Sequence, residues 1–181
     1  MKEDFARLLT ECGISLEAPA PAEPEKPAAD APPEEKSTEK KPVAAVKKAA
    51  GPIAVTEYKQ KGFHLDVTIP FDQAVAGARI LDRHGYTLEA VTGVDWLADK
   101  QLEVVYDYNH FAEHSRVVVR TRVARDNPEL PTVSEVFPGA NWHERETHDF
   151  FGIKFLGHPD LSPLLLPEDA DFHPLLKDYT P

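Results

Sequence analysis

A break in composition near residue 50 constrains the fold more than any other feature of the sequence. From Ala18 to Ala50 the chain consists mainly of Ala, Pro, Glu and Lys, with no aromatic residue, Leu or Ile. Burial of so few apolar groups cannot offset the entropy lost when the backbone is ordered. Six acidic residues are balanced by six lysines, and the prolines favour an extended spacer. We therefore predict a disordered linker over residues 18–50.

The predicted linker separates a short N-terminal segment from a folded domain and its C-terminal tail. Residues 1–17 are predicted to hold a short amphipathic helix, which is too short to persist alone and is either a docking peptide or a frayed terminus. Its apolar positions recur at helical spacing: Phe5, Leu8, Leu9 and Cys12. Residues 51–151 are predicted to form one α+β domain, and residues 152–181 an extended tail that binds a partner.

The charge balance and the cysteine count exclude several classes of protein. The 181 residues include 20 Lys and Arg against 31 Asp and Glu, a formal net charge of -11. Such an acidic chain is not expected to bind nucleic acid or anionic lipid directly. The single cysteine, Cys12, excludes an internal disulfide, a cysteine-ligated iron–sulfur cluster and a thiolate zinc site.

No apolar run approaches the roughly 18 to 20 residues that a membrane-spanning helix requires. The acidic N-terminus, Met1 to Asp4, lacks the apolar core of a secretion signal. We therefore expect a soluble, intracellular protein.

Hydrophobic periodicity predicts a strand, a helix and three further strands within the domain. The expected elements are a strand at 63–69, a helix at 71–84, and strands at 88–96, 102–108 and 117–123. Alternation in the second strand places one set of side chains on the same side: Leu88, Ala90, Thr92, Val94 and Trp96. The loop at 110–114 is short enough for an antiparallel hairpin. This order predicts an α+β fold, a mostly antiparallel sheet with helices on one face, followed by an extended C-terminal tail.

Two capping boxes predict further helices. Thr132 with Glu135 predicts a short helix that ends at Pro138. Asn141 with Glu144 predicts a second helix, from about Trp142 to Phe151, which Gly152 closes. The tail after this helix holds five prolines and no long periodic run, so its apolar residues need cover from its own domain or from another subunit.

Residues 143–149, His-Glu-Arg-Glu-Thr-His-Asp, form the densest group of chemically active side chains. A shared zinc ion is not expected, because His143 and His148 lie about 140° apart around a helix. Glu144, Glu146 and His148 could form an acid–base site, but such neighbours on a helix do not converge. A structural or interface role is therefore favoured, and an autonomous acid–base enzyme is the alternative. No phosphate loop or serine-nucleophile motif occurs, so we expect no catalytic, cofactor-binding or metal-binding residues.

Ordered motifs in the last third of the chain carry a resemblance to a known family. They are N-W-H-E-R-E at 141–146, D-F-F-G-I at 149–153, G-H-P-D-L at 157–161 and K-D-Y at 177–179. The chain resembles the 30 kDa subunit (the C-type subunit) of proton-pumping NADH:quinone oxidoreductase, respiratory complex I, and the related subunits of energy-converting hydrogenases. The resemblance covers about residues 63–179.

The resemblance implies a non-catalytic structural subunit of the peripheral arm, whose tail wraps and braces a large neighbour. This neighbour is the forty-nine-kilodalton-type (D-type) subunit, which we call the quinone-site subunit. The resemblance also implies that this chain binds no cofactor, and that partner subunits hold iron–sulfur clusters and quinone. It implies a peripheral location at the cytoplasmic face of the inner (plasma) membrane, within the complex. The implied interface or structural residues are Glu144, Arg145, Glu146, Asp149, Gly152, Gly157, His158, Pro159, Asp160, Leu161, Lys177, Asp178 and Tyr179.

The sequence departs from the family pattern at His148, where an aromatic residue is common, and at Ser162 and Leu176, where arginine is frequent. These departures leave open the equivalent subunit of a membrane-bound energy-converting nickel–iron hydrogenase, whose partner would hold a nickel–iron site. They also leave open a complex I that lacks the NADH module. A third interpretation is an adaptor that recruits a partner through residues 1–17 on their tether.

Overall fold

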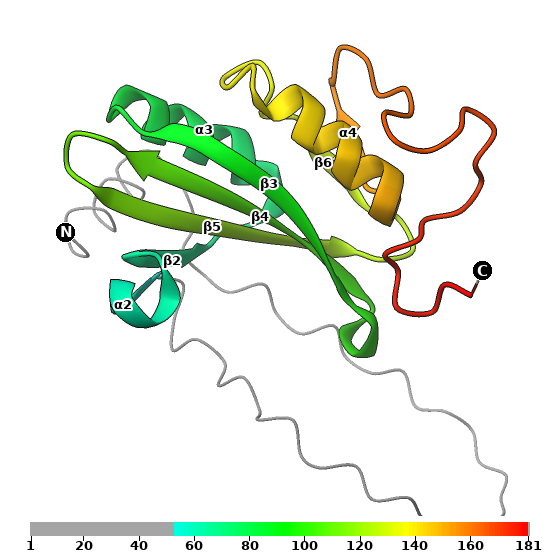
Figure 1. Cartoon of the computed structure of the whole chain (residues 1–181), viewed down its shortest axis with the longest axis horizontal. Coiled ribbons are helices and arrows are strands. Elements are labelled where there is room, and N and C mark those ends of the chain that lie inside the picture. Colours follow the sequence, from blue (N-terminus) through cyan, green and yellow to red (C-terminus); the bar gives the residue numbers. More distant parts are fainter. Residues whose placement is uncertain (1–52, 181) are drawn as a thin grey trace, which may run out of the picture.

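A five-stranded sheet with two helices across one face organises residues 53–180, the part of the chain that the computed structural model describes (Figure 1). The helix expected at 1–17 and the linker expected at 18–50 lie outside the described residues. The elements are β1 (Ile53–Val55), α2 (Tyr58–Lys61), β2 (Leu65–Thr68), η1 (Phe71–Gln73), α3 (Ala74–Arg83), β3 (Thr87–Trp96), η2 (Leu97–Asp99), β4 (Gln101–His110), β5 (Ser115–Ala124), β6 (Glu129–Pro131), α4 (Ala140–Phe151) and β7 (Lys154–Leu156).

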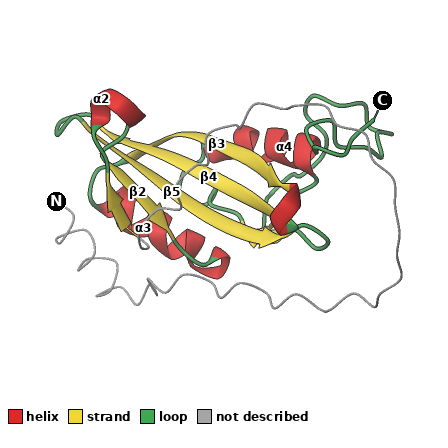
Figure 2. Cartoon of the chain, turned by 90° about the horizontal axis from the view of Figure 1, so that it is seen from below, coloured by secondary structure: helices red, strands yellow, loops and turns green. Residues whose placement is uncertain are grey.

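The strands of the main sheet lie in the order β1-β2-β5-β4-β3, which Figure 2 shows from the face opposite the two long helices. Only β2 and β5 pair in parallel; the other neighbours are antiparallel, including the predicted β4–β5 hairpin. β6 and β7 form a separate parallel pair. Residues 157–180 contain no helix or strand. The predicted α+β class is therefore confirmed.

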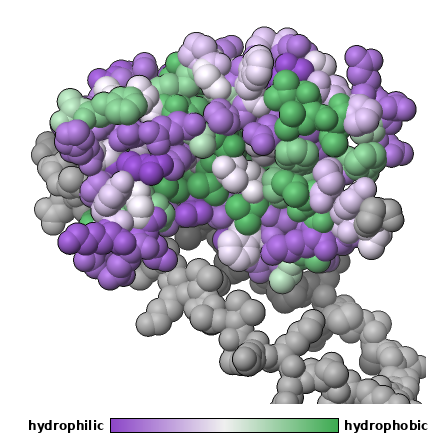
Figure 3. All heavy atoms as spheres, in the orientation of Figure 1, coloured by the Kyte–Doolittle hydropathy of each residue, from purple (hydrophilic) through white to green (hydrophobic). Residues whose placement is uncertain are grey.

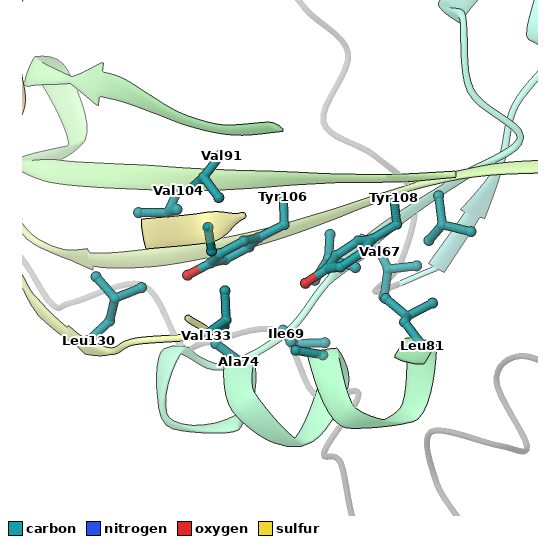
Figure 4. Packing of buried hydrophobic residues seen from close by; sticks show 14 of the residues in the cluster. Val67, Ile69, Ala74, Leu81, Val91, Val104, Tyr106, Tyr108, Leu130 and Val133 are labelled. Atoms are coloured by element: carbon teal, nitrogen blue, oxygen red, sulfur yellow. The ribbon is translucent and has the colours of Figure 1, made fainter. Parts of the chain in front are cut away.

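One face of the sheet carries the core because its strands alternate as the sequence predicts. Tyr106 and Tyr108 of β4 are fully enclosed, and Figure 4 shows their rings between the sheet and α3. Val117 and Val119 of β5 lie beside them on the same face. α3 covers this layer with Leu81 among its buried side chains.

The opposite face is charged, and its arginines are paired within the sheet. Arg116 contacts Glu89, Arg120 contacts Asp66, and Arg122 contacts Glu103. Glu103 is almost fully enclosed, because Arg120 and Arg122 approach it from two sides while Trp96 donates its Nε1–H. The three arginines are thus neutralised by carboxylates of their own chain.

The alternation predicted for β3 is wrong because the strand contains a bulge. Leu88 pairs with Tyr108 and Ala90 with Asp107, so Glu89 is an extra residue without a partner in the ladder. After this point the side chains change face. Leu88 packs against the core, but the core-facing residues that follow are Val91, Gly93 and Asp95.

Both predicted capping boxes are also wrong. Residues 132–139 form turns rather than a helix, and α4 begins after Gly139 without a side-chain cap. The reason is a tertiary contact, since the Thr132 hydroxyl donates to the carboxylate of Glu144 instead of capping a helix of its own. The predicted C-terminal end of α4 is confirmed, with Gly152 in the left-handed conformation at φ 74°.

Helix α4 lies close to β3 because β3 has a glycine at the contact. A Cβ atom added to Gly93 would lie 2.4 Å from Cδ2 of Phe151, at the last turn of α4. This close approach brings the C-terminal end of α4, and therefore the start of the tail, onto the sheet.

We predict that Gly93→Ala lowers the free energy of unfolding by about 1–3 kcal/mol, because the methyl group overpacks the α4–β3 contact. Chemical denaturation followed by circular dichroism measures the change. Gly139→Ala is the matched control, since a Cβ there meets no atom within 4 Å. Equal stability of the two variants would show that α4 does not depend on this contact.

Candidate functional site

Three enclosed carboxylates attach the segments that follow the sheet to the folded domain. They are Asp95 of β3, 2% exposed, and Glu144 and Asp149 of α4, 0% and 3% exposed. Each accepts at least one backbone N–H from a segment without regular secondary structure. A buried carboxylate requires such donors, because burial without hydrogen bonds strongly disfavours its charged form.

Asp149 holds the middle of the tail. The N–H groups of Leu164, Leu165 and Leu166 donate to its Oδ2, with N···O distances of 2.9, 2.7 and 3.1 Å. Burial alone would raise the pKa of Asp149, but these three donors hold the pKa below its ordinary value. The backbone carbonyl of Asp149 also accepts from Nδ1 of His173, at 2.8 Å.

Asp95 holds the end of the tail. Its Oδ2 accepts the N–H of Lys177 at 2.8 Å, and its carboxylate pairs with Arg125 through Nε at 3.1 Å and Nη2 at 3.3 Å. The same guanidinium contacts Asp178. Hydrogen bonds to Asp178 and Asp95 raise the pKa of Arg125, so the guanidinium stays charged. One arginine thus joins β3 to the last residues of the tail.

Glu144 holds the loop before α4. Its Oε1 accepts the N–H of Val133 at 2.8 Å, and its Oε2 accepts the hydroxyl of Thr132. Nε2 of His158, in the tail, lies 3.8 Å from the same oxygen. Burial raises the pKa of Glu144 to about 7, although both hydrogen bonds act in the opposite direction.

Arg145 and Gly152 shape the path of the tail between these attachments. Arg145 donates to the carbonyls of Ser162 and Pro163, each at 2.9 Å. Gly152 turns the chain out of α4 at positive φ, and an added Cβ would lie 2.6 Å from Nε2 of His173. Only glycine therefore fits between the end of α4 and this ring.

We call the region where α4 meets the tail and the loop at 132–139 the junction. Most of the interface or structural residues implied by the resemblance lie there, and their roles differ. Glu144, Arg145 and Asp149 contact the loop or the tail through their side chains. From the tail, the side chain of His158 approaches Glu144 and that of Asp178 contacts Arg125, whereas Lys177 contributes its backbone. The remaining members with a local role are Asp160, which accepts the Ser162 N–H, Leu161, which packs on the core, Tyr179, which stacks on Phe172, and Gly157, at φ 82°. Glu146 and Pro159 are exposed and make no such bond within residues 53–180.

The sequence did not identify Asp95, Arg125 and His173 as members of this junction. Asp95 lies 82 positions from Lys177, and no local spacing encodes such a contact. Its one available signal was a carboxylate between two apolar residues, Val94 and Trp96. Thr132 was noticed, but as a helix cap rather than as the partner of Glu144.

The acid–base constellation suggested by the sequence does not come together. Glu144 is enclosed and Glu146 is exposed. His148 directs Nδ1 to the carbonyl of Ile153, at 2.9 Å. Within residues 53–180 no group of three His, Cys, Asp or Glu residues is placed to hold a metal ion. The same part of the chain contains no helix that is both long and apolar enough to cross a bilayer.

The tail exposes three large apolar side chains among charged ones such as Glu168 and Asp171. Leu165 is 58% exposed, Leu175 52% and Phe172 38%. In Figure 3 hydrophobic side chains gather over the half of the molecule where α4 and the tail lie. We call Leu165, Phe172 and Leu175 the tail strip.

Residues 67–181 match the family described as "Respiratory-chain NADH dehydrogenase, 30 Kd subunit". The chain belongs to this family. The predicted resemblance is thereby confirmed.

Relatives named as the C-type subunit of NADH-quinone oxidoreductase come from several bacteria. The protein of Roseiflexus castenholzii is 49% identical over 92 residues, which cover 50% of this chain and 53% of the relative. The protein of Moorella thermoacetica is 36% identical over 115 residues, which cover 62% and 78%. A C/D-type subunit of Phocaeicola vulgatus is 43% identical over 98 residues, 54% of this chain and 19% of that protein. The chain spans about half the length of the Roseiflexus relatives.

Two solved structures resemble this fold. One is the membrane-bound sulfane sulfur reductase, an archaeal respiratory membrane complex, with a TM-score of 0.59 and 28% identity over 64% of this chain and 71% of that one. The other is a trypsin-resistant fragment of Nqo5, with a TM-score of 0.50 and 33% identity over 54% of this chain and 82% of that one.

We predict that Asp149→Asn lowers the free energy of unfolding by about 2 kcal/mol at pH 7, because three N–H groups lose a charged acceptor. Hydrogen exchange of the Leu164, Leu165 and Leu166 amides should become about tenfold faster or more. Because the pKa of Asp149 is depressed in the folded state, its charge stabilises the fold above pH 4 and this contribution disappears as the pH falls further.

Asp171→Asn is the matched control, since Asp171 lies on the same tail, is exposed and accepts no hydrogen bond in the described structure. Mass spectrometry of the deuterated protein measures the exchange. If both variants exchanged at the wild-type rate, Asp149 would not be what holds the tail.

Proposed function

We propose that this chain is a non-catalytic structural subunit in the peripheral arm of a proton-translocating NADH:quinone oxidoreductase, complex I. Its tail braces the quinone-site subunit. Partner subunits hold the iron–sulfur clusters and the quinone. The chain lies at the cytoplasmic face of the membrane as a peripheral member of the complex.

One observation carries this proposal: backbone hydrogen bonds fix the tail to its own domain while the side chains of the tail strip stay exposed. Asp95 and Asp149 hold the backbone, while Leu165, Phe172 and Leu175 remain in water. A neighbouring subunit that covered these side chains would remove their apolar surface from water. A segment that is already ordered loses less conformational entropy on association, so more of the burial energy appears as affinity.

The relatives support the quinone-site subunit as the partner. In Phocaeicola vulgatus one protein is named as a C/D-type subunit, and this chain matches 19% of its length. A single protein that carries both names is consistent with subunits that lie side by side. The tail strip is the surface of our chain that fits such a neighbour.

A second candidate is the equivalent subunit of another membrane-bound respiratory complex, such as an energy-converting nickel–iron hydrogenase. The similarity to the archaeal membrane-bound sulfane sulfur reductase favours it, because a similar fold occurs there in a complex of different chemistry. The two candidates differ in the large subunit, whose cysteine pairs would distinguish a nickel–iron site from a quinone site. An autonomous acid–base enzyme has less support, because Glu144, Glu146 and His148 do not share a site.

We predict that the triple variant Leu165→Ser, Phe172→Ser and Leu175→Ser binds the quinone-site subunit about tenfold more weakly or worse. Each substitution removes apolar surface that contributes about 1.5–3 kcal/mol when it is fully buried. Co-expression with the large subunit from the same organism, followed by affinity purification and titration, measures the loss.

Phe111→Ser is the control, because Phe111 is 64% exposed in the β4–β5 loop and lies outside the tail. Its binding should equal that of the wild type. The bracing proposal is overturned if the triple variant retains full affinity, or if the isolated wild-type chain is a stable monomer that the large subunit does not bind.

A further inference from the structure

Glu144 has fewer groups to offset its charge than Asp95 or Asp149. Asp95 has Arg125, and Asp149 has three N–H donors. Glu144 has one N–H and one hydroxyl, and within residues 53–180 no Lys or Arg side chain pairs with it. Burial disfavours the charged form of a carboxylate with so few donors, so the neutral acid is favoured more strongly than in an exposed carboxylate.

The groups that face Glu144 from the packed elements do not supply a positive charge. From β4, Tyr106 and Tyr108 are neutral, because burial and the charge of Glu144 raise the pKa of each hydroxyl. Along α4, His148 directs Nδ1 to the Ile153 carbonyl. From the tail, the side chain of His158 is the titratable group that approaches closest, at 3.8 Å.

His158 is held in one tautomer. The N–H of Asp160 donates to its Nδ1 at 3.1 Å, so the ring proton lies on Nε2. This Nε2–H group has its nitrogen 3.2 Å from the carbonyl of Asn141 and 3.8 Å from Oε2 of Glu144. The ring can therefore donate to either oxygen after a small rotation.

A chain of hydroxyls connects Glu144 to the surface. Thr132 donates to Glu144, and its Oγ1 lies 2.7 Å from the hydroxyl of Ser134. Ser134 lines an open depression, together with Glu135, Pro138, Asn141, Gly157 and Pro159. Ser134 is 8% exposed, so a proton from solvent has a path along the two hydroxyls to the carboxylate.

We propose that Glu144 is a proton-binding site, filled from the surface through Ser134 and Thr132, whose charge decides whether His158 donates to Asn141 or to Glu144. Burial places the pKa of Glu144 at about 7, so the site changes occupancy near neutral pH. The proton thus controls how α4, the loop at 132–134 and the turn at 157–160 are joined. This inference does not depend on the partner proposed above.

The first test observes the wild-type protein directly. Carbon-13 NMR of the full chain follows the side-chain carboxyl resonances of glutamate from pH 4 to pH 9, and Glu144→Gln assigns the resonance by its loss. We expect an apparent pKa of 6 or higher for Glu144. A value below 6 overturns the proposal.

The second test measures stability against pH. The folded state holds a proton that the unfolded state has released between pH 4.5 and about pH 7, so rising pH favours unfolding. Relative to Glu144→Gln, the wild-type folding equilibrium constant should fall about 40-fold from pH 5 to pH 7. Glu146→Gln, on the exposed side of the same helix, should retain the wild-type slope. Parallel profiles for the wild type and Glu144→Gln overturn the proposal.

The third test follows His158. Its Nε2 resonance in nitrogen-15 NMR should shift at the pH at which Glu144 titrates, and this step should be absent in Glu144→Gln. A merely structural glutamate would not move this signal. An unchanged step in the variant overturns the coupling between Glu144 and the turn.

Discussion

The arrangement of this protein depends on hydrogen bonds between buried carboxylates and the backbone of a segment that has no secondary structure of its own. An extended tail leaves its N–H groups without ladder or helix partners, and an enclosed carboxylate leaves its oxygens without water. At Asp149 both groups find their hydrogen-bond partners, because three consecutive backbone N–H groups of the tail donate to one carboxylate oxygen. Asp95 repeats this solution at the end of the tail. The path of the tail is therefore specified without a strand or a helix.

Because α4 is a helix, its consecutive residues Glu144, Arg145 and Glu146 face different directions and have different roles. Glu144 faces inward and fixes the preceding loop, Arg145 reaches the carbonyls of the tail, and Glu146 remains in solvent. About one helical turn after Arg145, Asp149 also contacts the tail. Neighbours in sequence thus act in different directions, which explains why a dense cluster of charged residues forms no shared site. The helix functions as a clamp between the sheet and the tail.

The sequence predicted those features that depend on local periodicity. Alternation placed β4 and β5 with the correct faces, and Gly152 marked the end of α4. Alternation failed in β3, because the bulge at Glu89 reverses the faces of every residue after it. The capping boxes failed for a different reason, since Thr132 and Glu144 bind each other across the junction. Contacts such as Asp95 with Lys177 have no local signature, so they required the structure.

The strand order also determines when this protein can fold during its synthesis. Leu65 of β2 pairs with Val117 of β5, so the parallel partner of β2 is translated only after α3, β3 and β4. The edge of β2 that later pairs with β5 stays unpaired until the β4–β5 hairpin has left the ribosome. An aggregation-prone edge is exposed throughout this interval.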